Sequence, residues 1–541
     1  MTGTYKAFLK GCALLLVTAM LVFSFCACSQ GENASAAVTK VTLNKSSITL
    51  TSGDSYQLIA TASPEGASQD FSWKSSSNTY ATVTADGLVK VKNTGNKSAT
   101  VTITATSKAD ASKKATCTIT VKVAPPAAFT LSKTGMVTSG PGEDASREAV
   151  ISWHSPTKGT SLEFSDANGS EFIHTVDNSD CSEVLSTANW ADTATHYRCR
   201  VVLDGLTPGS TYKYRIKDAD GSYTATAQFK TAEYDTTNFS FMWLSDNHVP
   251  DGGTSTLDRI KELITSAKNK PDVDPDFVLF TGDMVNKGQI YRHWNYWSTS
   301  GLMSDMTYAF VCGNHDYYPY GSKDRTTNAY YKDVCAYPFN YSEDGKTVLD
   351  SNYWFIWNRV LFVCVDNFTS EGSETKTKSG SSFSDQLAWF KAVVEANAGD
   401  YDYLIYAQHL PFFDTDTEPC DYGYYDEWYK TFDLYKVDFA LSSDEHTYRR
   451  SYPLLNDAKV DLVDGKVASG TVYVVSNQTE GSSISKLDNE VTSGSEYVQY
   501  TAGGVGGVFF TVTPTEMTLH LIGSEGKEYD TITVAKKTRG Q

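Results

Sequence analysis

The stretch FSFMWLSDNH, residues 239–248, decides the fold of the C-terminal half of this chain. Its first six residues are almost all apolar and predict a buried strand, which the polar side chains of Asp246 and His248 follow closely. The same pattern, an apolar run that ends in a polar cluster, recurs downstream. Further strands are expected at residues 277–280, 308–312, 360–365, 403–406 and 439–441.

Segments with helical spacing separate several of these strands. Strands that alternate with helices predict an α/β (α+β) domain in which helices cover a central β-structure. The tail returns to period-two alternation, so we expect strands to close a domain that spans residues 238–537. One apolar helix face is formed by Leu257, Ile260, Leu263 and Ile264, and a second by Leu387, Phe390, Val393 and Val394 after a candidate N-cap at Ser384.

Five polar segments stand at the ends of predicted strands. Strand ends fix the loop backbones that turn such side chains inward together. Carboxylate and carboxamide oxygens with imidazole nitrogens suit iron, manganese or zinc, and a shared carboxylate holds two ions side by side. Taken singly, each segment is also typical of a turn, a cap or a structural histidine. The segments are Asp246-Asn247-His248, Gly282-Asp283, Gly313-Asn314-His315-Asp316, Gln408-His409 and Asp444-Glu445-His446.

In residue type and in order, these five segments resemble the calcineurin-like metallophosphoesterase superfamily. The stretch QLAWFKAVV before the Gln408-His409 segment, together with a preceding β-sandwich, is most similar to the purple acid phosphatase branch. The resemblance implies hydrolysis of phosphate esters by a domain with a central β-sandwich flanked by helices. The implied partner is a small phosphate-ester substrate.

The resemblance also implies a role for each ligand. A hydroxide that bridges two metal ions would be the nucleophile, and the ions would be iron, manganese or zinc. Asp283 would be the bridging carboxylate. The first ion would be held by Asp246, His248, Asp283 and His446, and the second by Asp283, Asn314, His409 and Asp444.

Two further residues are candidate catalytic groups. His315 follows a metal ligand and would face the leaving oxygen, where an imidazole can donate a proton near neutral pH. Asp316 would orient that ring. The alternative for His315 is a hydrogen-bonding role without proton transfer.

The chain departs from the implied relatives at two positions. Asn286 stands where purple acid phosphatases carry a metal-bound tyrosine, so we expect the visible charge-transfer band to be missing. Asp444 replaces the first histidine of the superfamily's Gly-His-x-His segment. Either Asp444 is an oxygen ligand that favours harder ions, or it turns away and the second metal is lost.

The N-terminus has the features of an export signal over residues 1–27, with basic residues before an apolar run. Phe25-Cys26-Ala27-Cys28 resembles a lipoprotein lipobox, which predicts lipidation of Cys28 and a membrane anchor. Ordinary signal cleavage and secretion is the alternative. Both place the mature protein outside the cytoplasm, with a flexible tether at residues 28–38.

Two strand-rich regions precede the predicted catalytic domain. Residues 39–123 contain VTLNKSSITLTSGDSYQLIATASPEGA and ATVTITATS, which resemble bacterial immunoglobulin-like group two domains. Such domains act as spacers or as adhesive modules that contact cell-wall or surface carbohydrate, and the resemblance leaves both open. Residues 124–233 end in VVLDGLTPGSTYKYRIKD, which resembles a fibronectin type III domain. The fold class is therefore two all-β sandwiches followed by the α/β domain.

Charge and cysteine usage exclude other classes. A formal charge of −18, from 64 acidic and 46 basic residues, disfavours binding to nucleic acid. No cysteine pair has the spacing of a structural zinc site. Cys181 and Cys199 are candidates to pair across neighbouring strands, whereas Cys312 and Cys364 lie in apolar runs typical of buried thiols.

Three functions remain open from the sequence. The leading hypothesis is a phosphomonoesterase that acts on small extracellular phosphate esters. A phosphodiesterase or nucleotidase with the same site is the nearest variant. A surface adhesin or scaffold with an impaired second metal site is the alternative from another class.

Overall fold

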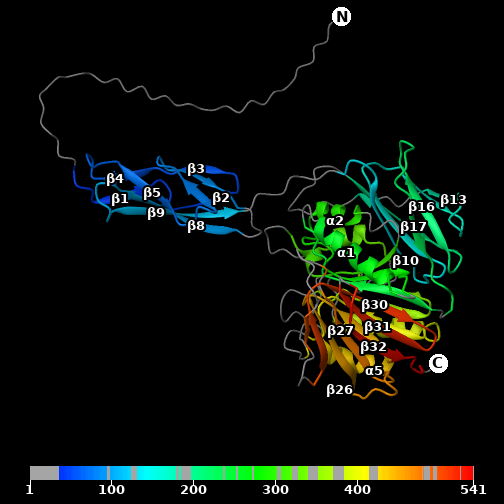
Figure 1. The fold of residues 1–541 in the computed structure, drawn as a ribbon. Helices are drawn as coiled ribbons and strands as arrows, with labels where there is room; N and C mark the ends of the chain where they lie inside the picture. The colour runs from blue at the N-terminus through cyan, green and yellow to red at the C-terminus, as the bar shows by residue number, and fades with distance from the viewer. Residues whose placement is uncertain are drawn as a thin grey trace, which may run out of the picture. The chain divides into compact units, whose positions relative to one another are not determined.

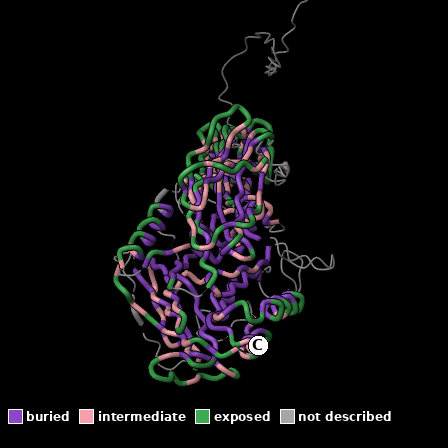
Figure 2. Tube along the Cα trace, turned by 90° about the vertical axis from the view of Figure 1, so that its right-hand side faces the viewer, coloured by how far each residue is buried: buried purple, intermediate pink, exposed green. Residues whose placement is uncertain are grey.

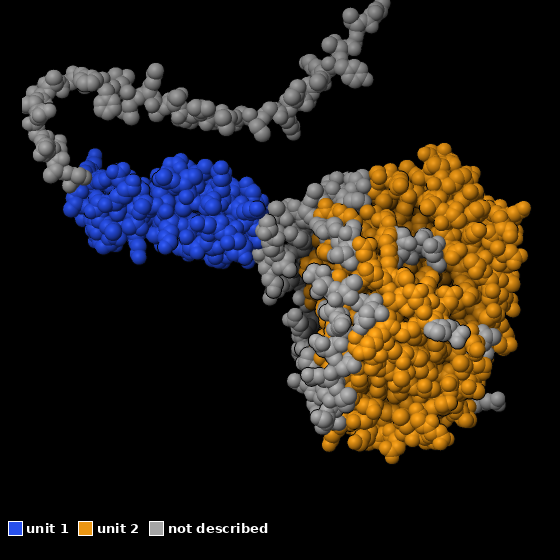
Figure 3. Space-filling model, in the orientation of Figure 1, with its two compact units in different colours: residues 1–124 blue, residues 125–541 orange. Residues whose placement is uncertain are grey.

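The structure of the protein is a computed structural model, shown in Figure 1. The chain divides into two compact units, unit 1 (residues 1–124) and unit 2 (residues 125–541), which Figure 3 colours separately. The predicted signal, Cys28 and most of the tether lie outside the described residues. These are 36–93, 98–122, 131–177, 182–183, 196–235, 238–250, 254–270, 273–300, 306–319, 327–338, 351–368, 383–413, 419, 424–477, 479, 488–490, 496–523 and 526–539.

Unit 1 is a β-sandwich. In its strand ATVTITATS, Val101, Ile103 and Ala105 are buried while the alternating threonines point outward, as period-two patterning requires. The strands order as β2-β9-β8-β5 and β3-β7-β6, with β1 paired to β4. They are β1 Lys40–Leu43, β2 Ser47–Thr51, β3 Ser55–Gln57, β4 Ala60–Ser63, β5 Phe71–Ser75, β6 Ala81–Val83, β7 Leu88–Val91, β8 Ala99–Ser107 and β9 Lys114–Lys122.

Unit 2 begins with a second β-sandwich, called here the first sandwich of unit 2. Its two sheets order as β10-β11-β15-β14 and β13-β12-β16-β17 around a core that includes Trp153 and Tyr214. Cys199 in this sandwich is disulfide-bonded, and Cys181 lies outside the described residues. The strands are β10 Gly135–Pro141, β11 Ala149–Ser155, β12 Ser161–Ser165, β13 Phe172–Asp177, β14 Ser182–Glu183, β15 Tyr197–Leu203, β16 Thr211–Lys217 and β17 Ala227–Lys230.

The rest of unit 2 is built on two larger sheets. One orders as β20-β19-β18-β30-β31-β32, and the other as β21-β22-β23-β24-β27-β25-β29-β28 with β26 paired to β25. The first sheet contains β18 Phe239–Leu244, β19 Phe277–Thr281, β20 Thr307–Val311, β30 Gly506–Val512, β31 Glu516–Gly523 and β32 Glu528–Ala535. The second contains β21 Tyr353–Trp357, β22 Val360–Cys364, β23 Tyr403–Ala407, β24 Phe439–Ser442, β25 Thr447–Leu455, β26 Ala458–Lys459, β27 Thr471–Val475, β28 Asp488–Glu490 and β29 Val498–Gly503.

Aromatic side chains join the two larger sheets into a sandwich. Phe241 of β18 stacks on Phe510 at 4.6 Å within its own sheet and meets Phe362 of the other sheet edge-on at 5.2 Å between ring centroids. Both geometries are favourable for aromatic rings. Figure 2 shows the buried residues running through the interior of this unit, with exposed residues on its outer loops.

Helices flank this sandwich. Phe390 and Phe432, on α4 and α5, share a buried cluster with Tyr406 of β23, while α1 lies beside β30 and β31. Ser384 lies inside the first turn of α4 rather than before it. Among the described residues no helix is long and apolar enough to cross a membrane. The helices are α1 Thr254–Lys268, α2 Tyr291–Ser298, α3 Ala329–Val334, α4 Phe383–Ala396 and α5 Tyr425–Tyr435, with a 3₁₀ turn η2 at His315–Tyr317.

The predicted fold class is confirmed: two β-sandwiches precede a helix-flanked central sandwich. Strands β18, β19 and β20 are parallel neighbours, and so are β22, β23 and β24. Parallel neighbours deliver their carboxyl ends to one edge of a sheet. The loops that follow these strands therefore form the candidate site.

Candidate active site

The structure brings all seven predicted metal ligands together. Asp246 and His248 follow β18, Asp283 follows β19, and Asn314 follows β20. From the second sheet, His409 follows β23, whereas Asp444 and His446 follow β24. Three overlapping groups of these residues, one of which includes His315, have the spacing of a metal site.

The first four-residue cluster surrounds the Nε2 atom of His248. This atom lies 3.1 Å from Nε2 of His446, 3.3 Å from Oδ2 of Asp283 and 3.9 Å from Oδ1 of Asp246. Nε2 of His446 is itself 3.5 Å from Oδ1 of Asp246. Metal–ligand bonds of about 2.0–2.2 Å put neighbouring ligand atoms of a tetrahedral shell about 3.4 Å apart. These four donors have that separation.

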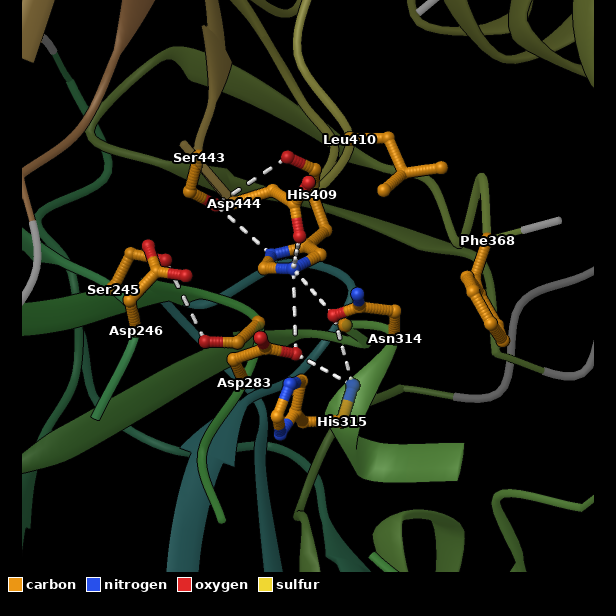
Figure 4. A network of polar contacts seen from close by, with 12 residues as sticks. Ser245, Asp246, Asp283, Asn314, His315, Phe368, His409, Leu410, Ser443 and Asp444 are labelled. Atoms are coloured by element: carbon orange, nitrogen blue, oxygen red, sulfur yellow. Dashed lines mark hydrogen bonds and ion pairs between the residues drawn. The ribbon is translucent and has the colours of Figure 1, made fainter. Parts of the chain in front are cut away.

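The second cluster surrounds the Nε2 atom of His409 (Figure 4). This atom lies 3.2 Å from Oδ1 of Asn314, 3.3 Å from Oδ1 of Asp283 and 3.5 Å from Oδ1 of Asp444. Asp444 thus turns toward the cluster. Asp283 presents Oδ2 to the first cluster and Oδ1 to the second, which is the arrangement of a bridging carboxylate.

Asp246 tests whether these residues fit a cation. Its side chain is 0% exposed, and among the described residues neither carboxylate oxygen has a hydrogen-bond partner. A buried carboxylate without donors is costly unless a positive charge compensates it. The two donor sets of oxygen and imidazole nitrogen suit first-row divalent ions. The residues therefore fit the metal ions that this fold implies.

The backbone at the site is strained. Asp246, His248, Asp283, Asp444 and His446 all have positive φ, between 44° and 72°, in the left-handed region that side-chain-bearing residues rarely adopt. Such strain persists where the surrounding structure imposes it and is concentrated at functional sites. Here it turns the ligand side chains into the site directly after each strand.

Two glycines make the approach of the loops feasible. A Cβ atom on Gly282 would lie 2.3 Å from Nδ1 of His409, and one on Gly313 would lie 2.3 Å from the backbone nitrogen of Asp283. Both distances are far inside van der Waals contact. The Gly-Asp and Gly-Asn pairs of the sequence are therefore required by packing as well as by the turn.

Two residues that the sequence did not single out orient His409. Its Nδ1 lies 2.6 Å from the carbonyl of Thr281 and 3.0 Å from the hydroxyl of Ser443. A carbonyl only accepts, so Nδ1 carries the hydrogen and Nε2 keeps its lone pair for the second cluster. Ser443 precedes a predicted ligand, but its residue type alone gave no signal of this role.

The clustered charges perturb one another. Burial acts to raise the pKa of Asp283, but His409, His315 and His248 together lower it. Burial lowers the pKa of His248 to about 4 despite the nearby carboxylates. A deprotonated carboxylate and a neutral imidazole are the forms that bind a metal ion.

His315 and Asp316 occupy different environments. Nδ1 of His315 lies 2.9 Å from the carbonyl oxygen of Asn286, which fixes the hydrogen on Nδ1. The carboxylate of Asp316 is buried and accepts from the backbone nitrogens of Met284 and Gly313, at 3.1 and 2.9 Å. The contact that orients the His315 ring therefore comes from Asn286, where the sequence suggested Asp316. Asp316 instead ties together the loops after β19 and β20.

Tyr318 is a further neighbour that the sequence did not reveal. Its hydroxyl accepts from the amide nitrogen of Asn314 at 3.2 Å, which leaves the amide oxygen of Asn314 facing His409. Its ring stacks on His315 with centroids 4.3 Å apart. His293, Trp294 and Trp297, considered as cleft residues from the sequence, are buried packing residues of α2.

Family profiles match most of the chain. The profile described as Calcineurin-like phosphoesterase matches residues 239–448, and Purple acid Phosphatase, N-terminal domain, matches residues 137–231. Bacterial Ig-like domain (group 2) matches residues 37–119.

Among curated relatives, the chain is similar to two uncharacterised proteins of Mycobacterium tuberculosis, from strains CDC 1551 / Oshkosh and ATCC 25618 / H37Rv. Each is 25% identical over 371 residues, which cover 62% of this chain and 67% of the relative. Purple acid phosphatase PPD1 from yellow lupin (Lupinus luteus) seeds has a TM-score of 0.58 at 14% identity, over 84% of this chain and 82% of that chain. PhoD has a TM-score of 0.50 at 14% identity, over 76% and 92%.

The two solved structures share the fold of this chain, and the profiles match it in the order that the sequence predicted. The chain therefore belongs to the calcineurin-like metallophosphoesterases, with a bacterial Ig-like domain and a purple acid phosphatase N-terminal domain ahead of its catalytic domain, and it is a phosphoesterase.

Proposed function

We propose that the protein is an exported phosphomonoesterase in which a two-metal site and the general acid His315 cleave small phosphate esters. The observation that supports this most directly is the pair of four-donor clusters that share Asp283. A single shared carboxylate places two cation sites side by side. That arrangement suits displacement at phosphorus, where both the attacking and the leaving oxygen need stabilisation.

The first ion would be held by Asp246, His248, Asp283 and His446, and the second by Asp283, Asn314, His409 and Asp444. When bound, the ions supply a nucleophile from water at neutral pH and polarise the phosphoryl group. The chain's contribution is to fix the geometry. His409 is held by Thr281 and Ser443, and Asn314 is held by Tyr318.

His315 would supply the proton for the leaving group. Because the Asn286 carbonyl retains the hydrogen on Nδ1, the transferable proton is the one on Nε2. As the phosphorus–oxygen bond breaks, the Nε2–H bond breaks and the leaving oxygen takes the proton, leaving a neutral ring. Solvent then returns a proton to Nε2. The backbone nitrogen of His315 donates to Oδ1 of Asp283 at 2.8 Å, which ties the acid to the bridging carboxylate.

The second cluster favours hard ions. Asp444 contributes an anionic oxygen where the related motif has a neutral imidazole nitrogen. Oxygen-rich ligand sets prefer manganese, iron or magnesium relative to zinc. The added negative charge would also make a metal-bound water less acidic, which moves the pH optimum toward neutral or alkaline values.

The protein would act outside the cytoplasm. The export signal and the lipobox-like Cys28 support a lipid anchor on the outer face of the membrane, with secretion as the alternative. Unit 1 would then serve as a spacer between anchor and catalytic unit. A carbohydrate contact through unit 1 is a separate hypothesis.

Metal analysis by mass spectrometry beside two assays tests this function. The purified protein should bind two ions per chain and hydrolyse p-nitrophenyl phosphate faster than bis(p-nitrophenyl) phosphate. Exhaustive chelation should abolish turnover and manganese, iron or zinc should restore it. A preference for the diester would reassign the protein as a phosphodiesterase. One bound ion without turnover would favour a scaffold over an enzyme with a two-metal mechanism.

A further inference from the structure

The first sandwich of unit 2 contacts the catalytic domain through a buried hydrogen bond. Nδ1 of His154, in β11, lies 2.6 Å from the hydroxyl of Tyr291, the first residue of α2. The ring of His196 from the same sandwich stacks on Tyr291 with centroids 4.4 Å apart. All three side chains are buried. The start of α2 is therefore held by the preceding domain.

The direction of this hydrogen bond is determined by a second contact. Nε2 of His154 lies 3.1 Å from the backbone carbonyl of Asp333, which only accepts. Nε2 therefore carries the hydrogen, and Nδ1 of the neutral ring accepts from the Tyr291 hydroxyl. Burial lowers the pKa of His154 to about 3, so the ring stays neutral. The Tyr291 hydroxyl is thus a donor with a fixed partner.

Helix α2 in turn holds the segment before it, called here loop 286–290. Nδ1 of His293 accepts from the backbone nitrogen of Lys287 at 3.2 Å. The indole nitrogen of Trp294 donates to the backbone carbonyl of Gly288 at 2.8 Å. Both side chains are buried. The backbone of the loop is consequently attached to the helix that Tyr291 begins.

Loop 286–290 makes the contacts that place the general acid. The carbonyl of Asn286 fixes Nδ1 of His315, and the backbone nitrogen of Gly288 donates to the carbonyl of His315 at 2.8 Å. A Cβ on Gly288 would lie 1.7 Å from the carbonyl oxygen of Asp316, so the two segments are in close backbone contact. A shift of the loop would move the His315 ring.

We propose that the first sandwich of unit 2 positions the general acid, acting through Tyr291, helix α2 and loop 286–290 on the ring of His315. Tyr291 is then a positioning residue and not a catalytic one, because it touches neither substrate nor metal ligands. The inference rests on the proposed role of His315. It assigns this sandwich a part in the reaction that a spacer would not have.

Tyr291→Phe tests the inference, because it removes only the hydroxyl that His154 accepts from. The measured quantity is the ratio of kcat for an alkyl phosphate to kcat for p-nitrophenyl phosphate. Only the alkyl leaving group needs protonation, so a displaced acid lowers this ratio. We expect a fall of roughly 3- to 30-fold, against about 100-fold or more for His315→Ala.

Tyr212→Phe is the matched control. Tyr212 is a buried tyrosine of the same sandwich whose hydroxyl accepts from the backbone nitrogen of Thr207 at 2.9 Å. It is the same chemical change, with a comparable loss of one hydrogen bond, away from α2. We expect the wild-type ratio. Hydrogen exchange over residues 286–290 gives a readout without turnover, and it should speed up in Tyr291→Phe only.

A second pair of variants protects the test against misfolding of Tyr291→Phe. His293→Phe removes the acceptor for Lys287, whereas His293→Asn keeps an acceptor near the Nδ1 position. The ratio should fall in the first and recover in the second. If His315→Ala lowers the ratio but folded Tyr291→Phe and His293→Phe do not, the positioning inference is wrong and the proposed function stands. If His315→Ala itself leaves the ratio unchanged, the proposed acid fails and the inference fails with it.

Discussion

Asp246→Asn should stabilise the metal-free protein while abolishing its stabilisation by metal. Asp246 is 0% exposed, and its nearest polar neighbours are Nε2 of His446 at 3.5 Å and Nε2 of His248 at 3.9 Å. An unpaired buried charge costs several kcal/mol, whereas an unpaired buried amide costs about 1–3 kcal/mol. The difference predicts a gain of about 1–3 kcal/mol in the free energy of unfolding after chelation.

Asp366→Asn is the matched control, with the opposite expected sign. Asp366 is equally buried, but it accepts from the hydroxyls of Tyr317 and Ser351 at 2.6 and 2.7 Å. An amide nitrogen turned toward these donors would leave buried partners unsatisfied, which costs about 1–3 kcal/mol. Two buried aspartates in the same domain should therefore respond in opposite directions.

Calorimetry of the chelated and manganese-loaded proteins measures both effects. Chelated Asp246→Asn should melt about 2–5 °C above wild type, given the size of the unit. Saturating manganese at 100 times its Kd should stabilise wild type by about 2.7 kcal/mol and this variant by far less. A chelated Asp246→Asn protein that is less stable than wild type, or one that keeps the full metal-induced shift, would refute the reasoning.

Four further outcomes are expected. His315→Ala should lower turnover by about 10²–10⁴-fold for alkyl phosphates and much less for p-nitrophenyl phosphate in steady-state assays, and equal losses would indicate a positioning role instead. Asp444→His should keep two ions by mass spectrometry but shift preference toward zinc, whereas a second ion gained only by the variant would show that wild type lacks the second site. Iron-loaded protein should show no intense visible band, since Asn286 replaces the related tyrosine, and a purple preparation would contradict the ligand set of the first cluster. Labelling with a palmitate analogue should mark wild type but not Cys28→Ser, and label retained in that variant would rule out the lipobox.

The sequence alone predicted the architecture and the membership of the site. Apolar runs such as Phe239–Leu244 are local signals, because period and composition select strands without reference to distant residues. Ligand types placed after each run, as in Asp283 and His409, are likewise local. Since parallel strands deliver their ends to one edge, order along the chain was enough to predict which residues would meet.

The tertiary structure decided how those residues are held. Asn286 acts through its backbone carbonyl, which residue identity does not encode, and Asp316 turned to the backbone nitrogens of Met284 and Gly313. Likewise, the bond between His154 and Tyr291 joins positions 137 residues apart in the chain. Such contacts depend on the docking of whole domains and on which ring nitrogen carries the hydrogen. Neither is set by local pattern, because both follow from which acceptors the assembled fold places beside each side chain.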